Sequence, residues 1–63
     1  MTIKEFVEKY KVDTNICDLE KSDGSRVYCP ASIETYAGLV KYYEDSEIID
    51  HYTNEYGNLI FII

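Results

Sequence analysis

The sequence predicts a small α+β domain in the order α-β-β-α-β-β, with two helices packed on a small antiparallel sheet. Three observations predict this class. Two segments carry apolar residues at helical spacing, two pairs of segments rich in β-branched and aromatic residues flank turn residues, and 46% of the residues are apolar, which is typical of a folded chain. The 63 residues are expected to form a single domain (1–63), too small to enclose a large cofactor cavity.

The first helix is predicted over Thr2 to Lys11. Thr2 and Glu5 have the spacing of a capping box, in which each side chain accepts a hydrogen bond from the other residue's free backbone N–H. Apolar residues at i, i+3, i+4 and i+7 form one stripe that we expect to lie in the core. This stripe consists of Ile3, Phe6, Val7 and Tyr10.

A β-hairpin is predicted next, with its turn at residues 22–24. Gly24 suits the left-handed position that closes a three-residue loop. The resulting register pairs Glu20 with Arg26 across the strands. It also gives the hairpin one apolar face, made of Cys17, Leu19, Val27 and Cys29.

The second helix is predicted to begin after an N-cap at Ser32 and to run to about Tyr43. Gly38 in its interior costs about 1 kcal/mol relative to alanine, and we expect close packing against the sheet to explain it.

A second hairpin is predicted from residues 47–53 and 58–63, which flank a turn. Leu59 to Ile63 are apolar on both faces of the predicted strand. Such a strand would aggregate if its edge were exposed, so we expect it to be central in the sheet or covered by a helix or a partner.

The charge of the chain excludes several classes of partner. Twelve acidic residues against six basic ones give a formal charge of −6. Nucleic-acid phosphates and anionic membrane surfaces would repel such a chain, so we expect no direct nucleic acid and no membrane partner. The N-terminus lacks the pattern of a secretory signal, which predicts a cytoplasmic location.

Cys17 and Cys29 face each other in the predicted hairpin. A cross-strand disulfide and two reduced core thiols therefore both remain open, with the reduced state favoured in a reducing cytoplasm. His51 adds a third potential zinc ligand, but the chain lacks the close cysteine pair of small structural zinc sites, and we expect no metal. His51 is expected to be a partly exposed strand residue, with a pH-sensitive contact as the alternative.

Catalytic motifs are absent from the sequence. It contains no glycine-rich phosphate loop and no arrangement of a nucleophile with a base. We therefore expect neither an enzyme nor a cofactor.

The second half of the chain combines acidity with tyrosine. Residues 32–63 carry six acidic residues against Lys41 alone, and five of the seven tyrosines. Surface tyrosine among carboxylates is typical of a protein-binding patch, whereas a merely solvated acidic surface is the alternative. The predicted contact residues are Tyr42, Tyr43, Glu44, Asp45, Glu47, Asp50, Glu55 and Tyr56.

In size, acidity and tyrosine content the whole chain resembles the small acidic inhibitors carried by bacteriophages and mobile elements, such as anti-CRISPR proteins and DNA mimics. The resemblance implies an inhibitor that occludes the basic nucleic-acid-binding surface of a partner protein, for example a CRISPR effector, in the host cell cytoplasm if the protein is phage-encoded. The chain is expected to be a monomer or a dimer, and a monomer would favour the inhibitor. The alternative is an antitoxin, an immunity protein or an accessory subunit that acts through an obligate protein–protein interface. In that case the apolar C-terminal strand would add to a sheet of the partner.

Overall fold

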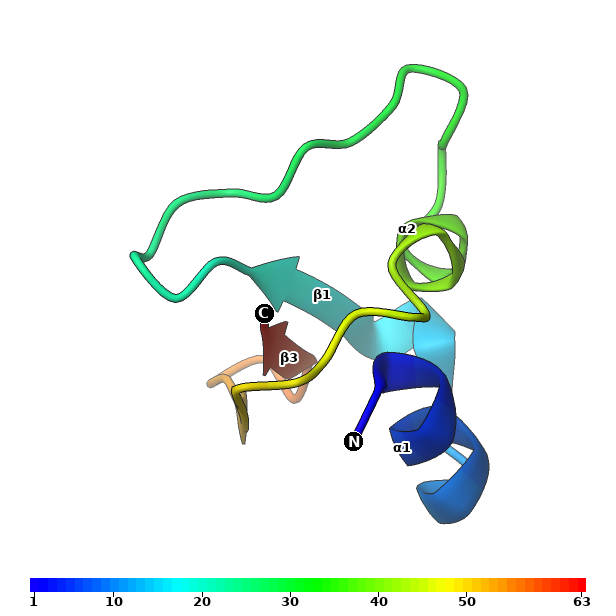
Figure 1. Ribbon diagram of the computed structural model, residues 1–63, viewed down its shortest axis with the longest axis vertical. Helices are drawn as coiled ribbons and strands as arrows, with labels where there is room; N and C mark the ends of the chain where they lie inside the picture. Colours follow the sequence, from blue (N-terminus) through cyan, green and yellow to red (C-terminus); the bar gives the residue numbers. More distant parts are fainter.

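The computed structural model describes residues 1–63 and contains two α-helices, one 3₁₀-helix and three β-strands (Figure 1). The elements are α1 (Ile3–Tyr10), η1 (Thr14–Ile16), β1 (Cys17–Glu20), α2 (Tyr36–Tyr42), β2 (Asp50–Thr53) and β3 (Leu59–Ile62). The α+β class is confirmed, and the elements follow the predicted order, except that the second predicted strand is reduced to a single bridge at Arg26.

The sheet has the strand order β1-β3-β2, so β3 is the central strand. This confirms the expectation for the apolar C-terminal segment, which gains most burial when it has a neighbour on both edges. β3 pairs antiparallel with β2 and parallel with β1, where Cys17 lies opposite Leu59. The prediction of an antiparallel sheet is therefore wrong. β1 takes the edge of β3 that β2 leaves free, and the direction of the chain there makes the pairing parallel.

The first predicted hairpin is reduced to its turn. Gly24 adopts a φ of 85°, and the N–H of Lys21 donates to the carbonyl of Ser25 at 3.0 Å. Glu20 and Arg26 form a single antiparallel bridge, in the predicted register. Beyond this bridge the chain leaves β1 as a long loop (Figure 1), and Pro30, at the end of the predicted second strand, has no N–H to donate to a ladder. The predicted pairing of Cys17 with Cys29 is therefore not formed.

The first helix has the predicted capping box. The N–H of Glu5 donates to Thr2 Oγ1 at 3.2 Å, and the N–H of Thr2 donates to Glu5 Oε1 at 2.9 Å. Lys11 ends the helix in the left-handed conformation, with a φ of 52°. The N-terminal boundary follows from local sequence. The C-terminal boundary does not, because lysine is not a residue that favours the left-handed conformation.

The apolar stripe of α1 faces the sheet over only part of its length. Ile3 is fully buried, and the Phe6 ring packs edge-on against the Phe61 ring at 5.2 Å between centroids. Tyr10, which was predicted to lie in the core, is exposed. Its ring instead packs against the outer side of Phe6, with centroids 4.6 Å apart.

The second helix begins three residues later than predicted. Its N-cap is Thr35, whose Oγ1 accepts the N–H of Gly38 at 3.0 Å. Ser32 lies in a separate turn, in which the N–H of Ile33 donates to the carbonyl of Pro30. A side chain at position 38 would meet Ile33 Cγ2 and Thr35 Oγ1 at 3.2 Å, so the glycine accommodates the helix's own N-terminal turn rather than the sheet.

Replacing Thr35 with alanine is expected to lower the free energy of unfolding by about 1 kcal/mol, because the Gly38 N–H loses its partner. The matched change Ser32→Ala is expected to alter it by less than about 0.5 kcal/mol. Urea unfolding followed by circular dichroism measures both values. A larger loss for Ser32→Ala would contradict the cap assignment.

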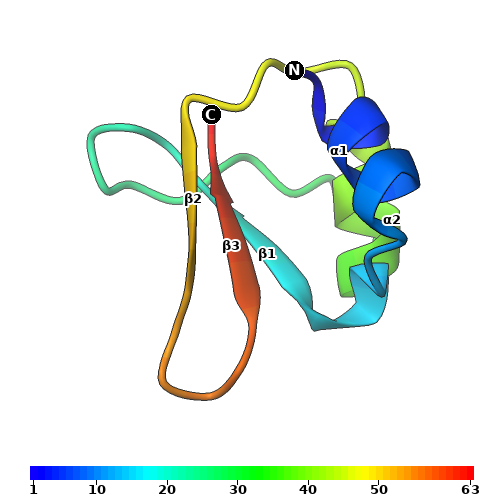
Figure 2. The same cartoon turned by 90° about the horizontal axis from the view of Figure 1, so that it is seen from below.

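Both helices pack on the same face of the sheet (Figure 2). Between the helices and this face lies a small core formed by Ile3, Cys17, Leu19, Leu39, Val40 and Phe61. No helix covers the opposite face of the sheet.

The start of the chain pairs with the segment that connects α2 to β2. The N–H of Ile3 donates to the carbonyl of Ser46 at 3.0 Å, and Thr2 forms an antiparallel bridge with Glu47. The predicted strand over residues 47–53 is therefore shorter, because Glu47 pairs with the N-terminal segment and the regular ladder with β3 covers Asp50–Thr53. The predicted second hairpin is otherwise confirmed.

Candidate protein-binding surfaces

Six of the seven tyrosine side chains are exposed, with exposed fractions between 44% and 80%. The exception is Tyr43, which is half-buried and whose hydroxyl donates to the backbone carbonyl of Tyr28. Burial raises the pKa of the Tyr43 phenol, with a smaller contribution from the neighbouring Tyr42 phenol. Most of the phenol rings are therefore available to a partner.

The carboxylates of the chain are almost free of ion pairs. The one salt bridge joins the N-terminal ammonium of Met1 to Glu47 Oε2 at 2.8 Å, and the hydrogen bond that the ammonium donates to this carboxylate raises the pKa of the ammonium. No acidic residue forms a salt bridge with a lysine or arginine side chain. Even Glu20 and Arg26, which face each other at their bridge, do not form an ion pair. The excess negative charge is thus not neutralised within the molecule.

Five of the predicted contact residues follow one another closely at the end of α2 and after it, and we call residues 42–47 the post-helix segment. The Tyr42 and Tyr43 rings pack edge-to-face with centroids 5.0 Å apart. The other predicted contact residues of this segment lie in the turn and the extended chain that follow, and they are Glu44, Asp45 and Glu47.

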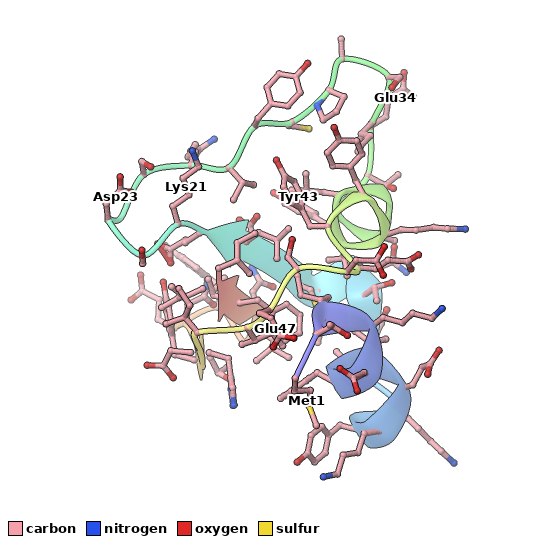
Figure 3. All side chains as sticks on the ribbon, viewed as in Figure 1. Met1, Lys21, Asp23, Glu34, Tyr43 and Glu47 are labelled. Carbon is pink, nitrogen blue, oxygen red and sulfur yellow. The ribbon has the colours of Figure 1, made fainter.

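The side chains of the post-helix segment point in different directions. Tyr43 points toward the loop that carries Tyr28, whereas Glu47 lies beside Met1 (Figure 3). Glu44 is half-buried and lines a shallow depression together with Lys4 and Lys41. Proximity along the chain therefore does not produce one acidic face here.

Asp50, Glu55 and Tyr56 lie further along the chain. Asp50 opens β2, next to the post-helix segment. Glu55 and Tyr56 occupy the β2–β3 turn at the far end of the hairpin (Figure 2), so the structure does not bring them together with residues 42–47.

Sequence reasoning missed a second group of polar side chains on the sheet. The Tyr52 hydroxyl of β2 donates to the Glu20 carboxylate of β1, which places this phenol across the central strand. That hydrogen bond raises the pKa of Tyr52, and the charges of Glu20 and Asp18 contribute in the same direction. The signal in the sequence is the alternation of Asp18 and Glu20 along β1, but this alternation does not reveal that β3 lies beside β1 and that Tyr52 of β2 reaches across β3.

The two cysteines lie in different environments, and both are free. Cys17 is buried, and burial raises the pKa of its thiol, whereas Cys29 is exposed. His51 is an exposed residue of β2, as predicted, and its ring packs against Phe6 with centroids 4.9 Å apart. No group of three or more histidine, cysteine or acidic side chains is arranged to hold a metal ion.

Neither α-helix has the length and apolar composition that crossing a membrane requires. Comparison of the chain with protein-family models, with curated protein sequences and with solved structures finds no match.

Proposed function

We propose that this protein is a small acidic inhibitor that occludes a basic nucleic-acid-binding surface of a partner protein, in the manner of DNA mimics and anti-CRISPR proteins. One observation carries the proposal: six of the seven tyrosines are exposed among carboxylates of which none pairs with lysine or arginine. Unpaired carboxylates attract and orient a cationic surface, and exposed phenol rings supply rigid contact area.

The proposed mechanism is steric and electrostatic. Carboxylates occupy the positions at which the partner's arginine and lysine side chains would otherwise bind phosphates, and guanidinium groups stack on the tyrosine rings. The post-helix segment and Asp50 form one contact region, and Glu55 with Tyr56 form another at the opposite end of the hairpin. The partner is a basic nucleic-acid-binding protein, of which a CRISPR effector is one example, and the site of action is the cytoplasm.

The alternative of an antitoxin, an immunity protein or an accessory subunit depended on the apolar C-terminal strand as an interface. β3 is hydrogen-bonded to β1 and β2 on its two edges, which leaves this strand no free edge for a partner. Size-exclusion chromatography with light scattering separates the two functions, because an obligate subunit is expected to self-associate or precipitate when it is alone.

To test the proposed inhibitor function, the partner is first captured on this protein from a bacterial lysate. The partner is then purified, and its binding to this protein is measured. Its affinity for this protein is expected to fall at least about tenfold as salt rises from about 50 to about 500 mM. The protein is also expected to displace nucleic acid from the partner in a competition assay. Salt-independent affinity, or a ternary complex that still holds nucleic acid, would overturn the proposal.

A further inference from the structure

The two faces of the sheet differ in what covers them. Side chains alternate between the faces along each strand. Cys17 and Leu19 of β1 and Phe61 of β3 point to the helices and are at most 3% exposed. The residues between them in sequence point to the other face, over which no helix lies (Figure 2).

The uncovered face holds six side chains in two rows across the three strands, and we call it the open face. Asp18, Ile60 and Tyr52 form one row, and Glu20, Ile62 and Asp50 form the other. Three of these six residues are acidic and none is basic. The acidic side chains stand on the two edge strands, each about 5 Å from the apolar central strand.

Hydrogen bonds to the backbone hold two of these carboxylates in place. Asp18 Oδ1 accepts the N–H of Leu19 at 2.8 Å, and Asp50 Oδ1 accepts the N–H of His51 at 2.7 Å. The backbone of Glu20 bonds to β3, so by alternation the Leu19 N–H points to the outer edge of β1, on which only the single Glu20–Arg26 bridge is formed. Each aspartate side chain therefore accepts a hydrogen bond from a backbone N–H at an outer edge of the sheet, and this N–H is no longer free to pair with another strand.

Tyr52 completes the open face. Its hydroxyl reaches Glu20 on the opposite edge strand, so its ring lies across β3, and Ile60 beneath it is only 5% exposed. The Tyr52 side chain itself is 44% exposed. The open face thus presents an aromatic surface between fixed carboxylates.

We propose that the open face is the docking surface for an arginine-rich segment of the partner protein. This inference rests on the proposed function and assigns its main contact to Asp18, Glu20, Asp50 and Tyr52. Arginine fits this arrangement because its planar guanidinium pairs with carboxylates through parallel hydrogen bonds and stacks on an aromatic ring at the same time. An acidic segment would be repelled, and a purely apolar one would leave three carboxylates desolvated without partners.

Two variants of equal charge test the assignment. The open-face variant Asp18→Asn, Glu20→Gln, Asp50→Asn removes three negative charges while its amide oxygens can still accept the same hydrogen bonds. The post-helix variant Glu44→Gln, Asp45→Asn, Glu47→Gln removes the same charge elsewhere. Thermal unfolding by circular dichroism confirms that each variant is folded before binding is measured.

The probe is a fluorescein-labelled oligoarginine peptide, and binding is measured by fluorescence anisotropy at about 50 mM salt. We expect the open-face variant to bind at least about tenfold more weakly than the post-helix variant. Arg26→Gln is expected to strengthen binding, because Arg26 is the basic residue opposite Glu20 at the margin of the open face.

Equal weakening in the two variants would overturn the docking surface and leave the proposed function standing, because the peptide would then respond to net charge alone. No binding of the peptide to the unmodified protein would overturn the proposed function itself. Chemical-shift changes in an NMR titration provide an independent readout. They are expected at Tyr52, Ile60 and Ile62, and changes confined to residues 42–47 would contradict the open face.

Discussion

Replacing Phe61 with alanine is expected to leave a large fraction of the protein unfolded at 25 °C. Phe61 is fully buried on the central strand, and its ring meets Phe6 of α1 edge-on. Removal of such a ring costs about 3–5 kcal/mol through lost burial and the cavity that remains. A domain of this length has a total stability of roughly 3–9 kcal/mol, so the loss is comparable with the whole.

Urea unfolding followed by circular dichroism measures this effect. The matched control is Tyr56→Ala, which removes a ring of similar size that is 80% exposed in the β2–β3 turn. Its midpoint is expected to lie close to that of the unmodified protein. A Phe61→Ala variant that unfolds at the same urea concentration as the control would show that the core does not lie between β3 and α1.

The two thiols are expected to react with Ellman's reagent at rates that differ by at least about a thousandfold. Cys29 is exposed, whereas Cys17 is 1% exposed and reacts only when the domain opens. An opening free energy of about 4 kcal/mol corresponds to a protection of about a thousandfold. Burial also raises the pKa of the Cys17 thiol, which lowers the fraction of reactive thiolate at neutral pH.

The variant Cys29→Ser isolates the buried thiol, and Cys17→Ser isolates the exposed one. In concentrated urea both variants are expected to react at similar rates, which separates burial from intrinsic reactivity. Combining Cys29→Ser with Phe61→Ala is expected to abolish most of the protection, since both residues belong to one core. Equal rates for the two thiols in the native protein would contradict the placement of β1.

Local signals made part of the fold predictable. Thr2 and Glu5 cap α1 through contacts between near neighbours, and Gly57, with a φ of 82°, allows the turn of the second hairpin. The N-cap of α2 was less certain because Ser32 and Thr35 are both good capping residues. The turn from Pro30 to Ile33 decides between them, and a helical periodicity alone does not reveal it.

Long-range pairing was not predictable in the same way. The segment from Cys17 to Glu20 has an alternation that suits any strand partner, so the sequence favoured the neighbouring segment after Gly24. The structure keeps only one bridge to that segment, between Glu20 and Arg26, and β1 pairs along its other edge with β3 in parallel. The sequence of one chain does not show which strands pair along which edges.

The same limit applies to the candidate surfaces. The exposure of tyrosine among unpaired carboxylates could be predicted from composition, because so small a domain cannot bury seven phenols. The open face could not be predicted from composition, because it joins Glu20 from the nearly charge-balanced first half of the chain to Tyr52 from the acidic second half. Only the strand order brings these two residues together.

The position of β3 also governs the order in which the domain assembles. Its pairing with β1 joins residues more than forty positions apart, and closing so long a loop costs chain entropy before any contact is gained. Its pairing with β2 spans only a short turn. We therefore expect the hairpin of β2 and β3 to form first and β1 to pair with it later, so that this late pairing limits the folding rate of the domain.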